Sequence, residues 1–112
     1  MKISEITNYI ETTAPLAIQE SYDNSGLIAG NRNWEATGAL LTIDVTEAVI
    51  DDAIRKGVNL VIAHHPIVFS GLKKITGKNY VERTLIKAIK NDIAIYAAHT
   101  NLDNAANGVN HK

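Results

Sequence analysis

Residues 58–65 read Val-Asn-Leu-Val-Ile-Ala-His-His, and this stretch decides the fold that the sequence predicts. Its first six residues are mostly apolar and β-prone, which is typical of a short strand buried on both faces. Residues 93–98, Ile-Ala-Ile-Tyr-Ala-Ala, form a second run of this kind, and His99 follows directly. The two runs therefore predict buried strands, each of which is followed by histidine.

Helical patterns alternate with these strands along the chain. Apolar side chains at helical spacing predict helices over residues 3–13, 47–56 and 79–91. Further apolar runs predict a short strand over 26–30 and a strand over 38–44. Thr46 is a good N-cap for the middle helix, and Gly57 suits its C′ position. The resulting order, β-α-β-α-β, predicts an α/β fold with a parallel or mostly parallel sheet and helices on both faces.

Length and composition place limits on the function. The chain has 112 residues, which is enough for a single α/β domain spanning 1–112. Its net charge of −1 and pI of about 6.4 argue against nucleic acid as a partner. The first residues become acidic too early for a signal peptide, and no apolar run is long enough to cross a membrane. We therefore expect a soluble, cytoplasmic protein without a membrane partner.

Polar side chains gather where the predicted strands end. His64 and His65 follow one strand, His99 follows the next, and Asp44 ends the strand before both. In open α/β sheets, ligands bind outside the carboxyl ends of the strands, so these groups fall on one edge of the sheet. The chain has no cysteine, so a metal at this edge would be held by nitrogen and oxygen ligands.

Each of these residues also has a plainer interpretation. The histidine pair could belong to a surface loop. Neighbouring residues on an extended chain point to opposite sides. If the pair binds metal, two metal ions, or one metal ligand and one histidine with another role, therefore fit the pair better than one shared ion. His99 could cap a helix or orient a ligand. Asp103 could be the N-cap of a helix that starts at the next residue. Asp44 is more easily explained as organising the turn before the helix than as a ligand.

Five segments in a fixed order resemble one known family. They are Pro15-Leu16, residues 20–27 (Glu-Ser-Tyr-Asp-Asn-Ser-Gly-Leu), residues 42–46 (Thr-Ile-Asp-Val-Thr), residues 63–69 (Ala-His-His-Pro-Ile-Val-Phe) and residues 99–103 (His-Thr-Asn-Leu-Asp). Together they are similar to the NGG-one-interacting-factor-three-like family, whose bacterial members are named GTP cyclohydrolase 1 type 2 homologs. The resemblance runs from Ile3 to Asn110 and corresponds to the N-terminal part of the family, so we expect a fragment of a longer, two-part protein.

The resemblance implies a site and an assembly. It implies a toroidal homo-hexamer with two divalent metal ions in each subunit, in which His64 and His65 each ligate a different metal and Asp103 ligates one of them. His99 would lie beside the site, as a further ligand or as a residue acting on a ligand. The family's remaining ligands, a His and a Glu, come from the C-terminal part, and His111 does not match their motif. The resemblance therefore implies an incomplete site in this chain.

Two classes of function follow from this resemblance. One is a metal-dependent hydrolase acting on a small molecule, by purine-ring opening as in GTP cyclohydrolase chemistry or by phosphoester hydrolysis. The other is a metal-binding hexameric scaffold or regulatory protein that acts through partners without turnover. A set of histidine and carboxylate ligands suits zinc, iron, manganese and, less well, magnesium. The sequence leaves the catalytic residues, the metal and the substrate open.

Overall fold

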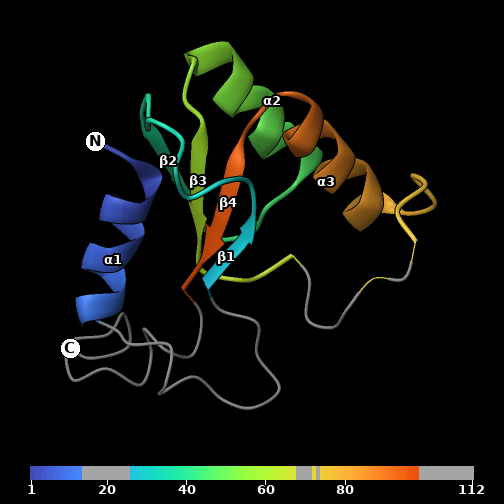
Figure 1. Ribbon diagram of the computed structural model, residues 1–112. Coiled ribbons are helices and arrows are strands. Elements are labelled where there is room, and N and C mark those ends of the chain that lie inside the picture. The colour runs from blue at the N-terminus through green and yellow to red at the C-terminus, as the bar shows by residue number, and fades with distance from the viewer. Residues whose placement is uncertain (14–25, 68–71, 73, 99–112) are drawn as a thin grey trace.

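The structure is a computed structural model that describes residues 1–13, 26–67, 72 and 74–98. In chain order the helices and strands of this part are α1 (Ile3–Thr13), β1 (Gly26–Ala29), β2 (Ala39–Thr42), α2 (Glu47–Lys56), β3 (Leu60–Ala63), α3 (Tyr80–Lys90) and β4 (Ala94–Ala97) (Figure 1). Each element predicted within these residues is present, and its ends differ from the expected ones by at most two residues. The helix foreseen after Asp103 lies outside the described residues.

The strands form one mixed sheet in the order β1-β4-β3-β2. The three strands β2, β3 and β4 run parallel, with Thr42 beside Ala63 and Ala63 beside Ala97 at their carboxyl ends. β1 pairs with β4 in the antiparallel direction and forms one edge of the sheet. The expectation of a mostly parallel α/β sheet is therefore confirmed, with one antiparallel strand added at the edge.

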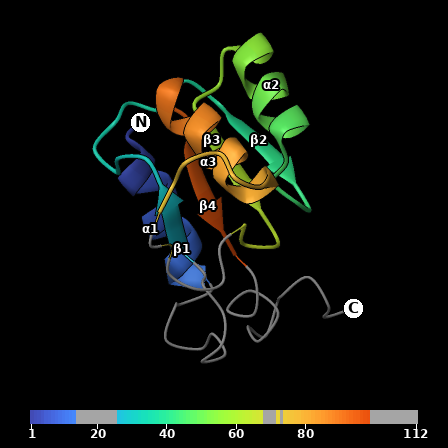
Figure 2. The same cartoon turned by 90° about the vertical axis from the view of Figure 1, so that its right-hand side faces the viewer.

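Helices α2 and α3 cover one face of the sheet (Figure 2). Their apolar sides and the sheet residues beneath them form the larger core, whose buried members are Val45, Ile50, Ala53, Val61, Ala63, Leu85, Ala88, Ile93 and Ile95. Side chains along a strand alternate between faces, so Val61 and Ala63 point to this core while Leu60 points to the other. This alternation explains why the strands read as continuous apolar runs.

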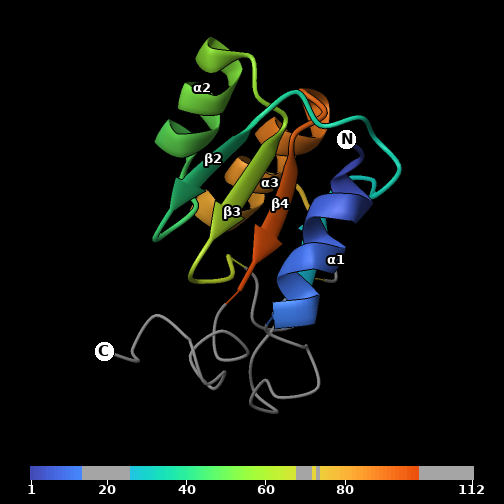
Figure 3. The same cartoon turned by 90° about the vertical axis from the view of Figure 1, so that its left-hand side faces the viewer.

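Helix α1 packs on the opposite face (Figure 3). The second core lies beneath it and consists of Ile3, Leu60, Ala94, Tyr96 and Ala98. The helix lies over the β4 side of this face, and Figure 3 shows the ribbons of β2 and β3 uncovered. A groove of about 720 Å³ remains there between α1 and the two strands, with Ile6, Tyr9, Leu41 and Ile62 among its lining residues. The expected helices on both faces are present, but the described part of the chain covers the α1 face only partly.

The ends of α2 follow the predicted capping residues. The Thr46 hydroxyl accepts a hydrogen bond from the backbone N–H of Val49 at 3.2 Å, which satisfies one of the helix's open donors. At the other end Gly57 adopts φ 69°, a left-handed conformation that costs glycine little. Thr46 thus marks where α2 begins after β2, and Gly57 marks where α2 ends before β3.

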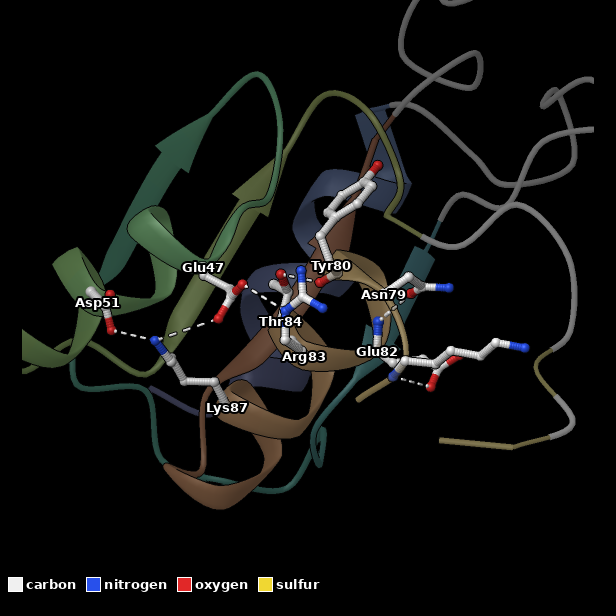
Figure 4. A network of polar contacts seen from close by, with 9 residues as sticks. Glu47, Asp51, Asn79, Tyr80, Glu82, Arg83, Thr84 and Lys87 are labelled. Carbon is white, nitrogen blue, oxygen red and sulfur yellow. Dashed lines mark hydrogen bonds and ion pairs between the residues drawn. The ribbon is translucent and has the colours of Figure 1, made fainter. Parts of the chain in front are cut away.

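A buried carboxylate holds the loop before α3 (Figure 4). Oε1 of Glu82 accepts hydrogen bonds from the backbone N–H groups of Thr76 and Lys78, each at 3.0 Å, and from the Thr76 hydroxyl at 3.3 Å. The side chain of Asn79 in turn caps the helix by accepting from the backbone N–H of Glu82 at 3.0 Å. The pKa of Glu82 is lowered, chiefly by the Thr76 N–H, because these bonds favour the ionised form.

Within the described residues, no helix is both long enough and apolar enough to span a bilayer.

Candidate metal centre

The histidine pair lies directly beyond the carboxyl end of β3, as the sequence predicts. Strand pairing continues past the end of β2: the backbone N–H of His64 donates to the Thr42 carbonyl at 3.1 Å, and that of His65 donates to the Ile43 carbonyl at 2.9 Å. Hydrogen bonds of this kind fix the backbone on which both imidazoles are mounted. The two side chains therefore start from ordered positions and not from a free loop.

The two imidazole rings lie close together. Their centroids are 4.9 Å apart and their planes are inclined by 43°. Residues facing opposite sides of a regular strand would hold their rings further apart, but the chain bends at positions 64 and 65 after β3 has ended. The bend brings two nitrogen-bearing rings to one place, which suits ligation of neighbouring metal ions.

Asp44 contacts the second histidine. Its Oδ1 lies 2.7 Å from Nδ1 of His65, a hydrogen bond between partly exposed side chains, with 43% of the His65 side chain and 65% of the Asp44 side chain accessible. The Asp44 backbone is held as well, since the Thr42 hydroxyl donates to its carbonyl at 2.8 Å. A carboxylate on one imidazole nitrogen is the usual way that proteins orient a histidine ligand.

The sequence contains a signal for this pairing that residue-by-residue interpretation misses. Thr42 and Ala63 are partners in the parallel pairing of β2 with β3. Counting two residues further along each strand brings Asp44 beside His65. The expectation that Asp44 only organises the turn before Thr46 is therefore incomplete, because the carboxylate reaches across to the neighbouring strand's histidine.

The carboxyl end of β4 lies at the same edge of the sheet. The backbone N–H of Ala98 donates to the Ala63 carbonyl at 2.9 Å, so the chain passes beside β3 at the residue before His64. His99 is the next residue along the chain, but it and Asp103 lie outside the described residues. The structure thus brings together Asp44, His64 and His65, and it leaves the other two predicted site residues as predictions.

The donors in this place match what a divalent metal requires, although they are few. Two imidazoles and a nearby carboxylate are ligand types for zinc, iron or manganese. Within the described ranges no three His, Asp or Glu side chains converge closely enough to hold a metal by themselves. A pocket of about 400 Å³ adjoins the pair and is lined by Asp44, Val45, Thr46, His65, Pro66, Ile67 and Tyr80. The residues fit part of a metal centre with space for a ligand beside it.

Known proteins share both the sequence and the fold. The family model described as Duf34/NIF3 (NGG1p interacting factor 3) matches residues 1–112. The GTP cyclohydrolase 1 type 2 homolog of Clostridium acetobutylicum is 41% identical over 110 residues, which are 98% of this chain and 41% of the relative. The protein of the same name from Bacillus subtilis is 45% identical over 106 residues, which are 95% of this chain and 28% of the relative.

Two solved structures resemble the fold closely. The reduced form of HcgD from Methanocaldococcus jannaschii superimposes with a TM-score of 0.90 at 37% identity, covering 99% of this chain and 44% of that chain. A Bacillus cereus protein related to NIF3 superimposes with a TM-score of 0.85 at 43% identity, covering 92% of this chain and 28% of that one. The chain therefore spans less than half the length of these relatives.

Proposed function

The chain belongs to the Duf34/NIF3 (NGG1p interacting factor 3) family, and from this premise we propose that it carries part of a dinuclear divalent-metal centre. His64 and His65 each hold one of the two metals, and Asp103 ligates one of them. His99 lies beside the site. The remaining ligands come from the part of the longer protein that this sequence does not include.

The observation that carries the proposal is the geometry of the histidine pair. Two adjacent imidazoles lie 4.9 Å apart at the carboxyl edge of a mostly parallel sheet, on backbone tied to β2. One of them is also held by a carboxylate at 2.7 Å. An ordinary surface loop has no reason to fix two histidines in this way, whereas a metal site needs both the proximity and the orientation.

For the longer protein we propose hydrolysis of an oxygen-rich small molecule such as a purine nucleotide. When bound, divalent metals lower the pKa of a coordinated water and polarise substrate oxygens. The chain's own residues supply the rest: His64 and His65 fix the position of the centre, and the pocket beside His65 provides room for a substrate, with Tyr80 on its wall. Several relatives bear the name GTP cyclohydrolase 1 type 2 homolog, which supports GTP as the first substrate to test.

Metal binding is tested by titrating the protein with Zn²⁺ and with Mn²⁺, followed by calorimetry and elemental analysis. We expect the wild type to bind metal. Loss of a hydrogen-bond partner of a ligand typically lowers metal affinity by roughly 10–100-fold, and His64→Ala or His65→Ala should lower it by more than that. Asp103→Ala should weaken it as well. Metal at a hundred times its Kd should also raise the free energy of unfolding by about 2.7 kcal/mol.

His111→Ala is the matched control, because His111 is the one remaining histidine of the chain and matches no motif of the site. It should leave the affinity unchanged. Equal affinity in wild type, His64→Ala and His65→Ala would show that the metal binds elsewhere and would refute the proposal. Two tightly bound metals per chain would instead show that the ligands beyond residue 112 are dispensable.

The hydrolase part is tested separately, by following GTP with the metal-loaded protein of full family length. The hydrolase proposal is supported if the wild type consumes GTP and the His65→Ala variant does not. If the wild type consumes GTP no faster than His65→Ala, the hydrolase proposal is wrong and a metal-binding role without turnover remains. Light scattering on the same sample tests the ring-shaped hexamer that the family resemblance suggests.

A further inference from the structure

We infer that Asp44 is a positioning residue: it fixes the tautomer and the orientation of the His65 ring, so that Nε2 is the nitrogen that donates to a metal. The inference rests on the proposed metal centre for its purpose, but its geometric part concerns this chain alone. It starts from the 2.7 Å contact between Asp44 Oδ1 and His65 Nδ1.

The identity of the two atoms decides the tautomer. An ionised aspartate has acceptors and no donor, so the proton in this hydrogen bond must be on Nδ1 of His65. In a neutral imidazole the other nitrogen then carries the lone pair. Histidine side chains in water favour the opposite tautomer, with the proton on Nε2. Asp44 therefore reverses the intrinsic preference of His65 and presents Nε2 as the electron-pair donor.

The backbone makes this contact reproducible. Asp44 follows β2 and His65 follows β3 at matching positions, because Thr42 and Ala63 are partners in the parallel register. The hydrogen bond from the His65 N–H to the Ile43 carbonyl joins the two segments at the residue before Asp44. The Thr42 hydroxyl donates a hydrogen bond to the Asp44 carbonyl and so also restrains the Asp44 backbone. The carboxylate therefore needs to order few rotatable bonds of its own to hold the ring.

A direct ligand role for Asp44 is the competing interpretation, and the chemistry separates the two. A ligating carboxylate acts only when metal is present, whereas a positioning carboxylate sets the tautomer in the metal-free protein. The ¹⁵N chemical shifts of an imidazole distinguish a protonated nitrogen from one with a lone pair. NMR of ¹⁵N-labelled, metal-free protein, recorded on the neutral form of the ring, therefore gives a direct answer.

The experiment compares wild type with Asp44→Ala, and uses Asp52→Ala as the matched control. Asp52 is also a partly exposed aspartate, but it pairs with Arg55 on α2 and not with a histidine. We expect the Nδ1–H tautomer for His65 in wild type and in the control, and a shift to the Nε2–H tautomer in Asp44→Ala. The amide spectrum of each variant tests directly whether it is folded.

Zn²⁺ affinity provides the second measurement. Loss of an outer carboxylate from a histidine ligand typically weakens metal binding by roughly 10–100-fold, so we expect a change of this size in Asp44→Ala and none in Asp52→Ala. The number of bound ions should stay the same, because Asp44 does not itself ligate.

The outcomes separate this inference from the proposed function. An Nε2–H tautomer for His65 in wild type, or the same tautomer in wild type and Asp44→Ala, overturns the positioning role. A loss of bound ions in Asp44→Ala with the tautomer unchanged identifies Asp44 as a ligand, which also overturns it. If the tautomer depends on Asp44 but the protein binds no Zn²⁺, the positioning role is supported and only the proposed metal centre is refuted.

Discussion

Tyr96 of β4 is the largest fully buried side chain of the described residues and belongs to the core beneath α1. Its side chain is fully buried, and its hydroxyl donates a hydrogen bond to Oε2 of Glu11 on α1 at 3.1 Å. This bond joins α1 to a central strand of the sheet. Burial, followed by the neighbouring Glu11 charge, raises the pKa of Tyr96 well above its ordinary range, because both disfavour the phenolate.

Tyr96→Phe removes this hydrogen bond while keeping the ring. We expect a loss of about 0.5–1.5 kcal/mol in the free energy of unfolding near neutral pH, since Glu11 is only partly buried and regains water. The raised pKa adds a pH signature. The folded state holds the phenolic proton more tightly than the unfolded state, so wild type loses stability as pH rises above 10, the group's ordinary value.

Urea denaturation at neutral pH and at rising alkaline pH measures both effects. The Phe variant should lose less stability at alkaline pH than wild type, while Tyr80→Phe, which changes an exposed tyrosine, should follow wild type. A Tyr96→Phe protein as alkali-sensitive as wild type would show that other groups cause the loss.

Two glycines provide a matched comparison of backbone effects. A Cβ at Gly30 would lie 2.6 Å from Ala94 Cβ and 2.7 Å from Ala94 Cα, at a φ of +103°. At Gly57 the space is open, and only the left-handed φ of +69° opposes a side chain. We expect Gly57→Ala to cost about 1 kcal/mol. Gly30→Ala should cost about 2–4 kcal/mol, because overlap with β4 adds to the strain. Thermal unfolding would contradict this account if the two losses were equal.

At the level of elements, the Glu82 contacts connect the segment around Thr76 and Lys78 to α3. Figure 4 shows this carboxylate together with a second group of charges, in which Arg83 and Lys87 of α3 pair with Glu47 and Asp51 of α2. The second group lies on the surface, where ion pairs contribute little. Glu82 is buried and accepts several hydrogen bonds, so it matters more for how the chain returns from the site to the helix.

Glu82→Gln should therefore change the acid stability of the protein. The lowered pKa of Glu82 means that its stabilising effect is complete above the ordinary value of 4.5 and is lost as pH falls below it towards the folded-state pKa. We expect the variant to be less stable than wild type at neutral pH and to lose less stability on acidification. Chemical denaturation across this range measures both, with Glu47→Gln as a surface control that should keep the wild-type slope.

Much at this scale could be predicted from the sequence, because local rules dominate there. The capping residues Thr46 and Gly57 and the apolar periods determine α2 and its neighbours, and all of these predictions are confirmed. The direction of β1 was not predicted. Four residues of apolar sequence carry no information about which strand they will pair with, and β1 pairs with β4, nearly seventy positions along the chain. The Asp44–His65 contact was missed for the same reason, since it depends on register between strands.

At the scale of the whole molecule, part of the α1 face is covered by none of the described residues, and this is their main departure from a regular three-layer fold. Leu41, 77% exposed, stands on β2 in a groove with mostly apolar lining residues. Parallel strands are normally covered on both faces, so this surface is unusual for such a sheet. Apolar periods predict which strands are buried, but they do not show how far one short helix extends across them.

Leu41→Gln tests how this face behaves in water. Because the side chain is already largely exposed, the free energy of unfolding should stay within about 0.5 kcal/mol of wild type. Binding of an apolar fluorescent dye to the folded protein should fall, whereas Ile89→Gln, which changes an exposed apolar residue of α3, should leave it unaltered. Unchanged dye fluorescence in Leu41→Gln would show that the dye does not bind in this groove.

The hydrogen bonds from the His64 and His65 amides to Thr42 and Ile43 have a consequence for timing. An amide in such a bond exchanges its proton with solvent only when the bond opens. Deuterium exchange at these two positions therefore reports how often the ends of β2 and β3 separate. Slow exchange would show that the backbone carrying the two imidazoles stays in place, so that only rotation of the side chains themselves could separate the rings.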